Sequence, residues 1–136
     1  MSNRRKPDSE RAKYKEYLHS NAWQKRSRQW RHEEQARTGR RPECAACLIT
    51  TSLELHHLDY TGVEWTRDGW VAEEQHDDIL ALCPRCHEAV HQLLDFESTY
   101  TALSRRNASL DAIRRLRSRI VAFIFNAPTD HIEGSR

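Results

Sequence analysis

The chain has 136 residues, of which 38% are hydrophobic and 31% charged, and its formal net charge is +2. This length fits a single domain with a modest core, which a structural metal would help to stabilise. The sequence has no long apolar run and no signal-like N-terminus, which excludes the membrane-spanning class and leads us to expect a cytoplasmic protein.

Charge is distributed unevenly along the chain. Residues 1–42 hold thirteen Lys and Arg against five Asp and Glu, residues 43–100 hold two against twelve, and residues 101–136 hold seven against three. Basic segments therefore flank an acidic centre, and such flanks are typical of contact with nucleic-acid phosphates. The alternative explanation for each single Lys or Arg is a solvated helix face.

The N-terminal part predicts a disordered basic tail over residues 1–10 and a helical basic region over residues 11–42. Ser20 predicts the N-cap of a second helix, which ends near Gly39, and aromatic residues at helical spacing are expected to pack on the rest of the domain. The basic side chains on the remaining surface are candidates for phosphate contacts: Lys25, Arg26, Arg28 and Arg31.

All four cysteines lie in two Cys-x-x-Cys pairs, Cys44/Cys47 and Cys83/Cys86, which are separated by 35 residues. Two such pairs point four thiolates at one ion, so the spacing predicts a structural zinc site that clamps two distant segments together. Disulfides are the alternative, but adjacent hairpins of this kind form strained disulfides more readily than stable ones.

Residues 48–58 predict a short hairpin that turns at residues 50–52 and carries His56 and His57 on its second strand. Alternation along a strand points neighbouring side chains to opposite faces, so the two histidines should differ in role. Residues 59–77 predict a long loop or irregular ribbon, in which two tryptophans either serve a function or only tie the loop to the core.

The C-terminal half predicts a short buried segment at residues 79–82 and a helix from about His87 to Leu94. His87 and His91 share one face of this helix, the arrangement in which two imidazoles hold one metal ion. After a connection from residue 96, a last helix from about Ser109 has an apolar stripe that needs burial against the domain or a second copy, so a homodimer is a hypothesis. The stripe consists of Leu110, Ile113, Leu116, Ile120, Phe123 and Ile124.

The ordered set of motifs resembles the HNH endonucleases, also called ββα-metal or His-Me finger nucleases, in the branch with two zinc knuckles. The resemblance covers about residues 14–92 and implies an α+β fold, with a small ββα-metal domain at residues 43–95 between N- and C-terminal helices. The matching residues are Tyr17, Leu18, Ser20, Trp23, the four cysteines, Leu53, His56, His57, Tyr60, and residues 78–91, with Ile79 where relatives usually have Leu.

The resemblance implies metal-dependent hydrolysis of phosphodiester bonds in DNA, or alternatively in RNA. His57 would be the general base, and His56, His87 and His91 would hold a catalytic divalent ion, Mg²⁺ or Mn²⁺, with Ni²⁺ or Zn²⁺ as alternatives. Asp78 stands where the family usually has Asn and would orient His57, although a carboxylate accepts hydrogen bonds and cannot donate them.

If the Asp78 carboxylate instead lay near the catalytic ion, it would favour the binding of Mg²⁺ or Mn²⁺ over Zn²⁺. Arg85, in the second cysteine pair, is a further candidate for DNA contact.

Two other function classes compete with the nuclease. A non-catalytic, zinc-stabilised nucleic-acid-binding module would lack the base or a ligand, and here none is missing. A zinc-stabilised adaptor would use its C-terminal helix to bind a protein partner. The histidines outside the motifs are expected on the surface: His19, His32, His76 and His131.

Overall fold

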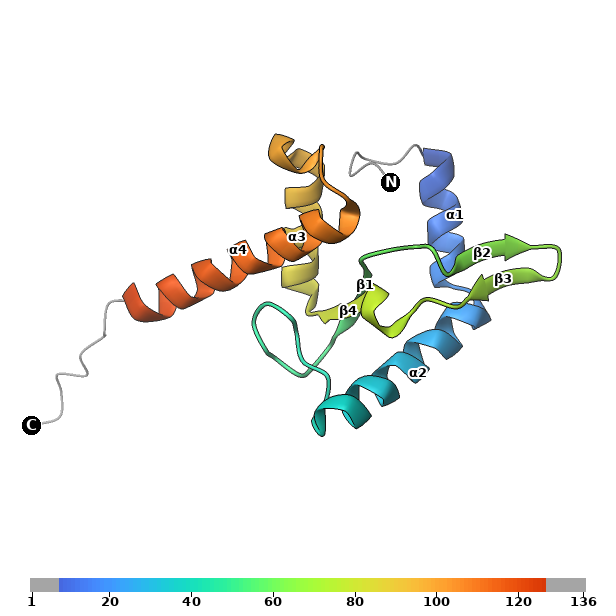
Figure 1. The fold of residues 1–136 in the computed structure, drawn as a ribbon, viewed down its shortest axis with the longest axis horizontal. Helices are drawn as coiled ribbons and strands as arrows, with labels where there is room; N and C mark the ends of the chain where they lie inside the picture. Colours follow the sequence, from blue (N-terminus) through green and yellow to red (C-terminus); the bar gives the residue numbers. More distant parts are fainter. Residues whose placement is uncertain (1–7, 127–136) are drawn as a thin grey trace, which may run out of the picture.

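A computed structural model describes residues 8–126 of the chain (Figure 1). This part is α+β, as the sequence predicts, with four α-helices and two small antiparallel sheets. The elements are α1 (Asp8–Leu18), α2 (Asn21–Thr38), β1 (Glu54–His57), β2 (Val63–Thr66), β3 (Gly69–Ala72), β4 (Ile79–Leu82), α3 (Pro84–Phe96) and α4 (Arg105–Asn126).

The second helix has the predicted ends, whereas the first begins three residues earlier than predicted. Ser20 caps α2 by accepting a hydrogen bond from the backbone N–H of Trp23, and Gly39 ends the helix with a left-handed backbone at φ 72°. Residues 8–10 of the expected disordered tail belong to α1, and residues 1–7 lie outside the described residues.

The strand that carries the two histidines pairs with β4, not with a neighbouring strand. His56 lies opposite Leu80 and His57 opposite Ile79 in the antiparallel register of β1 and β4. The predicted hairpin over residues 48–58 is therefore wrong. Leu48, at the start of the predicted first strand, has a positive φ of 70°, which breaks the extended conformation that this strand would need.

The expected irregular ribbon at residues 59–77 contains a regular hairpin of β2 and β3. Gly62 lies against the residues that follow this hairpin, where a Cβ atom would come within 2.3 Å of the carbonyl oxygen of Glu73. Trp70 packs on Tyr17 in α1, with ring centroids 5.3 Å apart, whereas Trp65 is 61% exposed. Of the two tryptophans, Trp70 is therefore the one that ties the hairpin to the helices.

The paired strands β1 and β4, which we call the central ribbon, are covered by helices on both faces (Figure 1). Leu55, Ile79 and Ala81 pack in a cluster with aromatic residues of α1 and α2. Leu80 and Leu82 pack in a second cluster with α3 and α4. Neighbouring residues of each strand therefore face different helices, as the period of two requires.

Helix α4 begins at Arg105, four residues before the predicted start, and buries only part of the predicted apolar stripe, Ile113 and partly Leu116. Its fully buried residues are the small Ala108, Ser109 and Ala112, which allow close approach, whereas Leu110 is 46% exposed. The C-terminal half of α4 projects away from the other helices (Figure 1), and Phe123 is exposed there. Within residues 8–126, every helix is too short or too polar to cross a membrane.

Candidate metal centres

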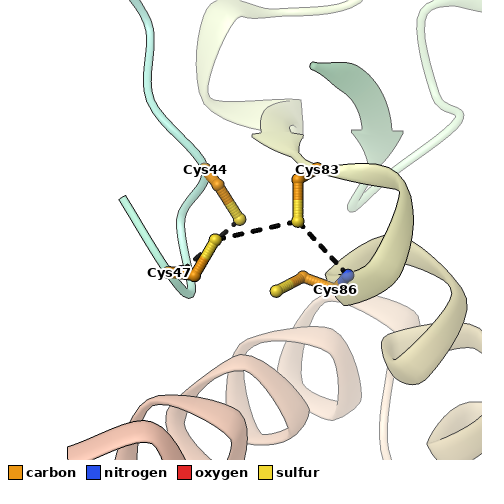
Figure 2. Close-up of side chains that lie close together, drawn as sticks. All are labelled: Cys44, Cys47, Cys83 and Cys86. Atoms are coloured by element: carbon orange, nitrogen blue, oxygen red, sulfur yellow. Dashed lines mark hydrogen bonds between the residues drawn. The ribbon is translucent and has the colours of Figure 1, made fainter. Parts of the chain in front are cut away.

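The four cysteines converge on one point between the loop after α2 and the start of α3 (Figure 2). Their sulfur atoms all lie within 4.8 Å of one another, and no disulfide joins them. In each pair the second residue donates its backbone N–H to the first sulfur at 3.5 Å, from Cys47 to Cys44 and from Cys86 to Cys83. The predicted cysteine cluster is confirmed, and it could hold one metal ion.

Thiolate formation is favoured at Cys44. Burial alone would raise the pKa of this thiol, but backbone N–H groups, that of Cys47 first among them, lower it to about 7. Because the thiolate is the form that binds a metal, Cys44 is prepared for ligation near neutral pH.

A second cluster consists of His56 on β1 and of His87 and His91 on α3, whose ring nitrogens lie within 4.8 Å of one another. The Nε2 atoms of His87 and His91 are 3.0 Å apart. Two imidazoles on one tetrahedral ion, with bonds of about 2.0–2.1 Å, would have nitrogens at a similar separation of about 3.3 Å. The three ligands expected from the sequence thus lie together.

Hydrogen bonds orient this histidine cluster. The Nδ1–H of His87 donates to the Glu54 carboxylate at 2.5 Å, which leaves the Nε2 lone pair for an ion. The Nε2 atom of His56 bonds the Ser109 hydroxyl at 2.9 Å, and its Nδ1 atom is buried without a hydrogen-bond partner among the described residues. Buried imidazole nitrogens normally have partners, so the orphaned Nδ1 fits a metal ligand.

The surroundings of His56 also favour the neutral form of its ring, which is the form that binds metals. Burial, followed by the positive charge of Arg105, holds the pKa of His56 well below its usual range. Three protein ligands leave a fourth position open, as in catalytic metal sites, whereas four cysteines close a tetrahedron.

His57 points to the other side of the central ribbon and is fully buried. Its ring stacks on Tyr60, with centroids 4.7 Å apart, and lies 4.6 Å from the Trp23 ring. The Tyr14 hydroxyl lies 3.4 Å from Nδ1 of His57. The adjacent histidines therefore differ in surroundings, as the alternation along a strand predicts.

Glu74, which the sequence reasoning missed, holds the other ring nitrogen of His57. Its Oε2 atom accepts hydrogen bonds from Nε2 of His57 at 2.7 Å and from the Tyr17 hydroxyl at 2.6 Å, and all three side chains are buried. Burial would raise the pKa of Glu74, but these two hydrogen bonds lower it overall, so the carboxylate stays ionised. No sequence signal separates Glu74 from the other acids of its segment.

Asp78 lies at the end of the central ribbon, where its carbonyl oxygen accepts from the backbone N–H of Leu58 at 2.7 Å. Its carboxylate pairs with Arg106 on α4. The carboxylate is not part of either ligand cluster found among residues 8–126. Through its backbone carbonyl, Asp78 thus fixes the end of β1, the strand that carries His57.

The predicted phosphate contacts differ in availability. Lys25, Arg28 and Arg85 are exposed, and Arg31 is half-buried with a hydrogen bond to the carbonyl of Leu53. The expectation for Arg26 is wrong, because this side chain is only 6% exposed. Its guanidinium donates to the carbonyl of Glu74 and pairs with Glu33, so it braces the segment behind His57.

The histidines outside the motifs also differ in exposure. His19 and His32 are exposed as expected, and His131 lies outside the described residues. His76 is half-buried, stacks on Trp30 at 5.1 Å and bonds two glutamates of α2, so it ties residue 76 to that helix.

Comparison with known proteins found no match among protein-family models, curated proteins or solved structures. The likeness to HNH nucleases thus rests on the sequence motifs alone.

Proposed function

We propose that the chain is a metal-dependent endonuclease of the HNH type, which hydrolyses phosphodiester bonds in DNA. One observation supports the proposal most. On one face of β1, His56 belongs to a cluster of three histidines, and on the other face the His57 ring is hydrogen-bonded to a carboxylate. Phosphodiester hydrolysis needs these two devices, one to stabilise charge and one to activate water.

His57 is the general base in this proposal. The Glu74 carboxylate can only accept a hydrogen bond, so the neutral imidazole carries its proton on Nε2 and its lone pair on Nδ1. Nδ1 then takes the proton of the attacking water, and Glu74 stabilises the imidazolium that results. Because His57 is buried, water must be admitted along the edge where the Tyr14 hydroxyl lies.

A divalent ion at the histidine cluster would stabilise the charge on the phosphate and on the leaving 3′ oxygen. His56, His87 and His91 would hold it, with Ser109 and Glu54 keeping two of the imidazoles in place. Three imidazoles without a carboxylate suit Ni²⁺ or Zn²⁺ better than Mg²⁺ or Mn²⁺. The four cysteines would hold a structural zinc that takes no part in the reaction.

The direct test is nicking of supercoiled plasmid after mild chelation, with Mg²⁺, Mn²⁺, Ni²⁺ and Zn²⁺ added separately. We expect the native chain to nick with at least one of these ions, and His57→Ala to be slower by about 10²-fold or more, since a general base contributes that much. His32→Ala, an exposed histidine on α2, is the matched control and should nick like the native chain.

Absence of nicking with every metal, while the DNA is still retained in a gel shift, would contradict the proposal. That result would favour the non-catalytic nucleic-acid-binding module.

A further inference from the structure

An open cavity of about 480 Å³ lies between the end of β1 and the start of α4. Tyr60, Ser104, Arg105 and Arg106 contribute to its lining. The cavity borders the proposed active site, because Arg105 donates a hydrogen bond from Nε to the carbonyl oxygen of His57 at 2.8 Å.

Arg105 is held in one orientation by two contacts. Besides the hydrogen bond to His57, its guanidinium lies over the Tyr60 ring, 5.0 Å from the centroid. Tyr60 is itself stacked on the His57 ring. These contacts use the Nε atom and one face of the guanidinium, so the two terminal nitrogens form a fixed fork.

The charge of Arg105 has no acidic partner among the described residues, in contrast to its neighbour Arg106. Arg106 pairs with Asp78 and donates to the carbonyl of Asp77. The remaining acid of the cavity, Asp59, accepts hydrogen bonds from the backbone and hydroxyl of Thr61. Arg105 is thus the cation of this cavity that keeps its charge for a ligand.

We infer that Arg105 binds the non-bridging oxygens of a DNA phosphate in this cavity, beside His57. The inference rests on the proposed function for the presence of DNA at this face. A planar guanidinium binds a phosphate with two parallel hydrogen bonds, and its attachment to the His57 backbone would place that phosphate at a constant distance from the base.

The test is fluorescence anisotropy of a labelled DNA duplex with the full chain, in a buffer without added divalent cations. Arg105→Gln retains an amide that can donate to the His57 carbonyl but removes the charge and the fork. We expect it to bind about tenfold more weakly, because a charged hydrogen bond is lost, and to lower the slope of log Kd against log salt by about 1. Arg67→Gln, in the exposed turn between β2 and β3, should change binding by less than about twofold.

Unchanged affinity and salt slope in Arg105→Gln would overturn the inference, as would a loss equal to that of Arg67→Gln. Arg105→Lys keeps the charge without the fork, so full affinity in this variant would overturn the bidentate contact. Far-UV circular dichroism and cobalt binding at the histidine cluster verify that each variant is folded. A native chain that binds DNA through Arg105 but never nicks it would contradict only the proposed function, and one that binds no DNA would contradict both.

Discussion

His56 and His57 are neighbours in the sequence, yet they acquire different chemistry from the residues that surround them. His56 has Ser109 on one ring nitrogen and no hydrogen-bond partner among the described residues on the other, and its ring lies 5.3 and 5.2 Å from those of His87 and His91. His57 has a buried carboxylate on Nε2 and aromatic rings around it. The first environment suits a metal ligand and the second suits a proton acceptor.

Glu74 provides a prediction at this scale. Glu74→Gln keeps the size of the side chain and an oxygen that can accept from His57 and Tyr17, but it removes the charge that would stabilise the imidazolium. We expect the nicking rate to fall by about tenfold or more, in line with the loss of a carboxylate behind a catalytic histidine. Glu73→Gln, an exposed neighbour, is the control for the loss of one negative charge.

Equal nicking rates for Glu74→Gln and Glu73→Gln would show that the carboxylate only fills space behind His57. Single-turnover kinetics separates such an effect on the chemical step from one on DNA binding.

The residues of the site differ in how far the sequence predicts them. His87 and His91 follow from helical spacing, and the four cysteines follow from their pairing, because both patterns are local. Glu74, Ser109 and Arg105 reach the site from 17, 53 and 48 residues away. Whether Glu73 or Glu74 faces His57 depends on the register of a hairpin that the sequence did not predict.

Among the elements, the central ribbon contains a strand that the sequence predicts and a strand pairing that it does not. The buried segment at residues 79–82 was predicted and forms β4, but its pairing with β1 is a contact between strands 22 or more residues apart. The sequence instead favoured pairing with the adjacent segment, in a hairpin over residues 48–58. The positive φ angle at Leu48, which is not a glycine, breaks the predicted partner strand and has no clear sequence signal.

Helix α4 is the second element that the sequence described incompletely. Its small buried residues lie against α3 and the central ribbon, and they deliver Ser109 to the histidine cluster. Large apolar residues at helical spacing do not indicate this part of the buried face, which consists of Ala and Ser. The C-terminal helix therefore contributes to the candidate metal centre, whereas the dimer that its exposed end suggested remains a prediction.

The contribution of α4 is tested with Ser109→Ala, which leaves the buried Nε2 of His56 without a partner. We expect the histidine cluster to bind Ni²⁺ about tenfold more weakly, since residues that orient a metal ligand contribute about 10–100-fold in affinity. Titration against a competing chelator measures this change. Ser118→Ala, at an exposed position of the same helix, is the control, and equal affinity in the two variants would contradict the role of Ser109.

In the molecule as a whole, two pairs of helices pack on opposite faces of one two-stranded ribbon. Each candidate metal centre brings together parts that are distant in sequence. The cysteines connect the loop after α2 to the start of α3. The histidine cluster connects β1 to α3, and Ser109 extends it to α4. Metal ions at these sites would stabilise so small a core, and this expectation from the length of the chain remains a prediction.

We predict that one chain binds metal at two different centres, a closed cysteine site and an open histidine site. Metal content by mass spectrometry, after equilibration with Ni²⁺ and removal of loosely bound ions, tests it most directly in the native chain, His87→Ala and His32→Ala. We predict about one zinc per chain in all three, and about one nickel per chain in the native chain and His32→Ala but none in His87→Ala. A native chain without nickel, or a His87→Ala variant with as much nickel as the native chain, would contradict the open histidine site.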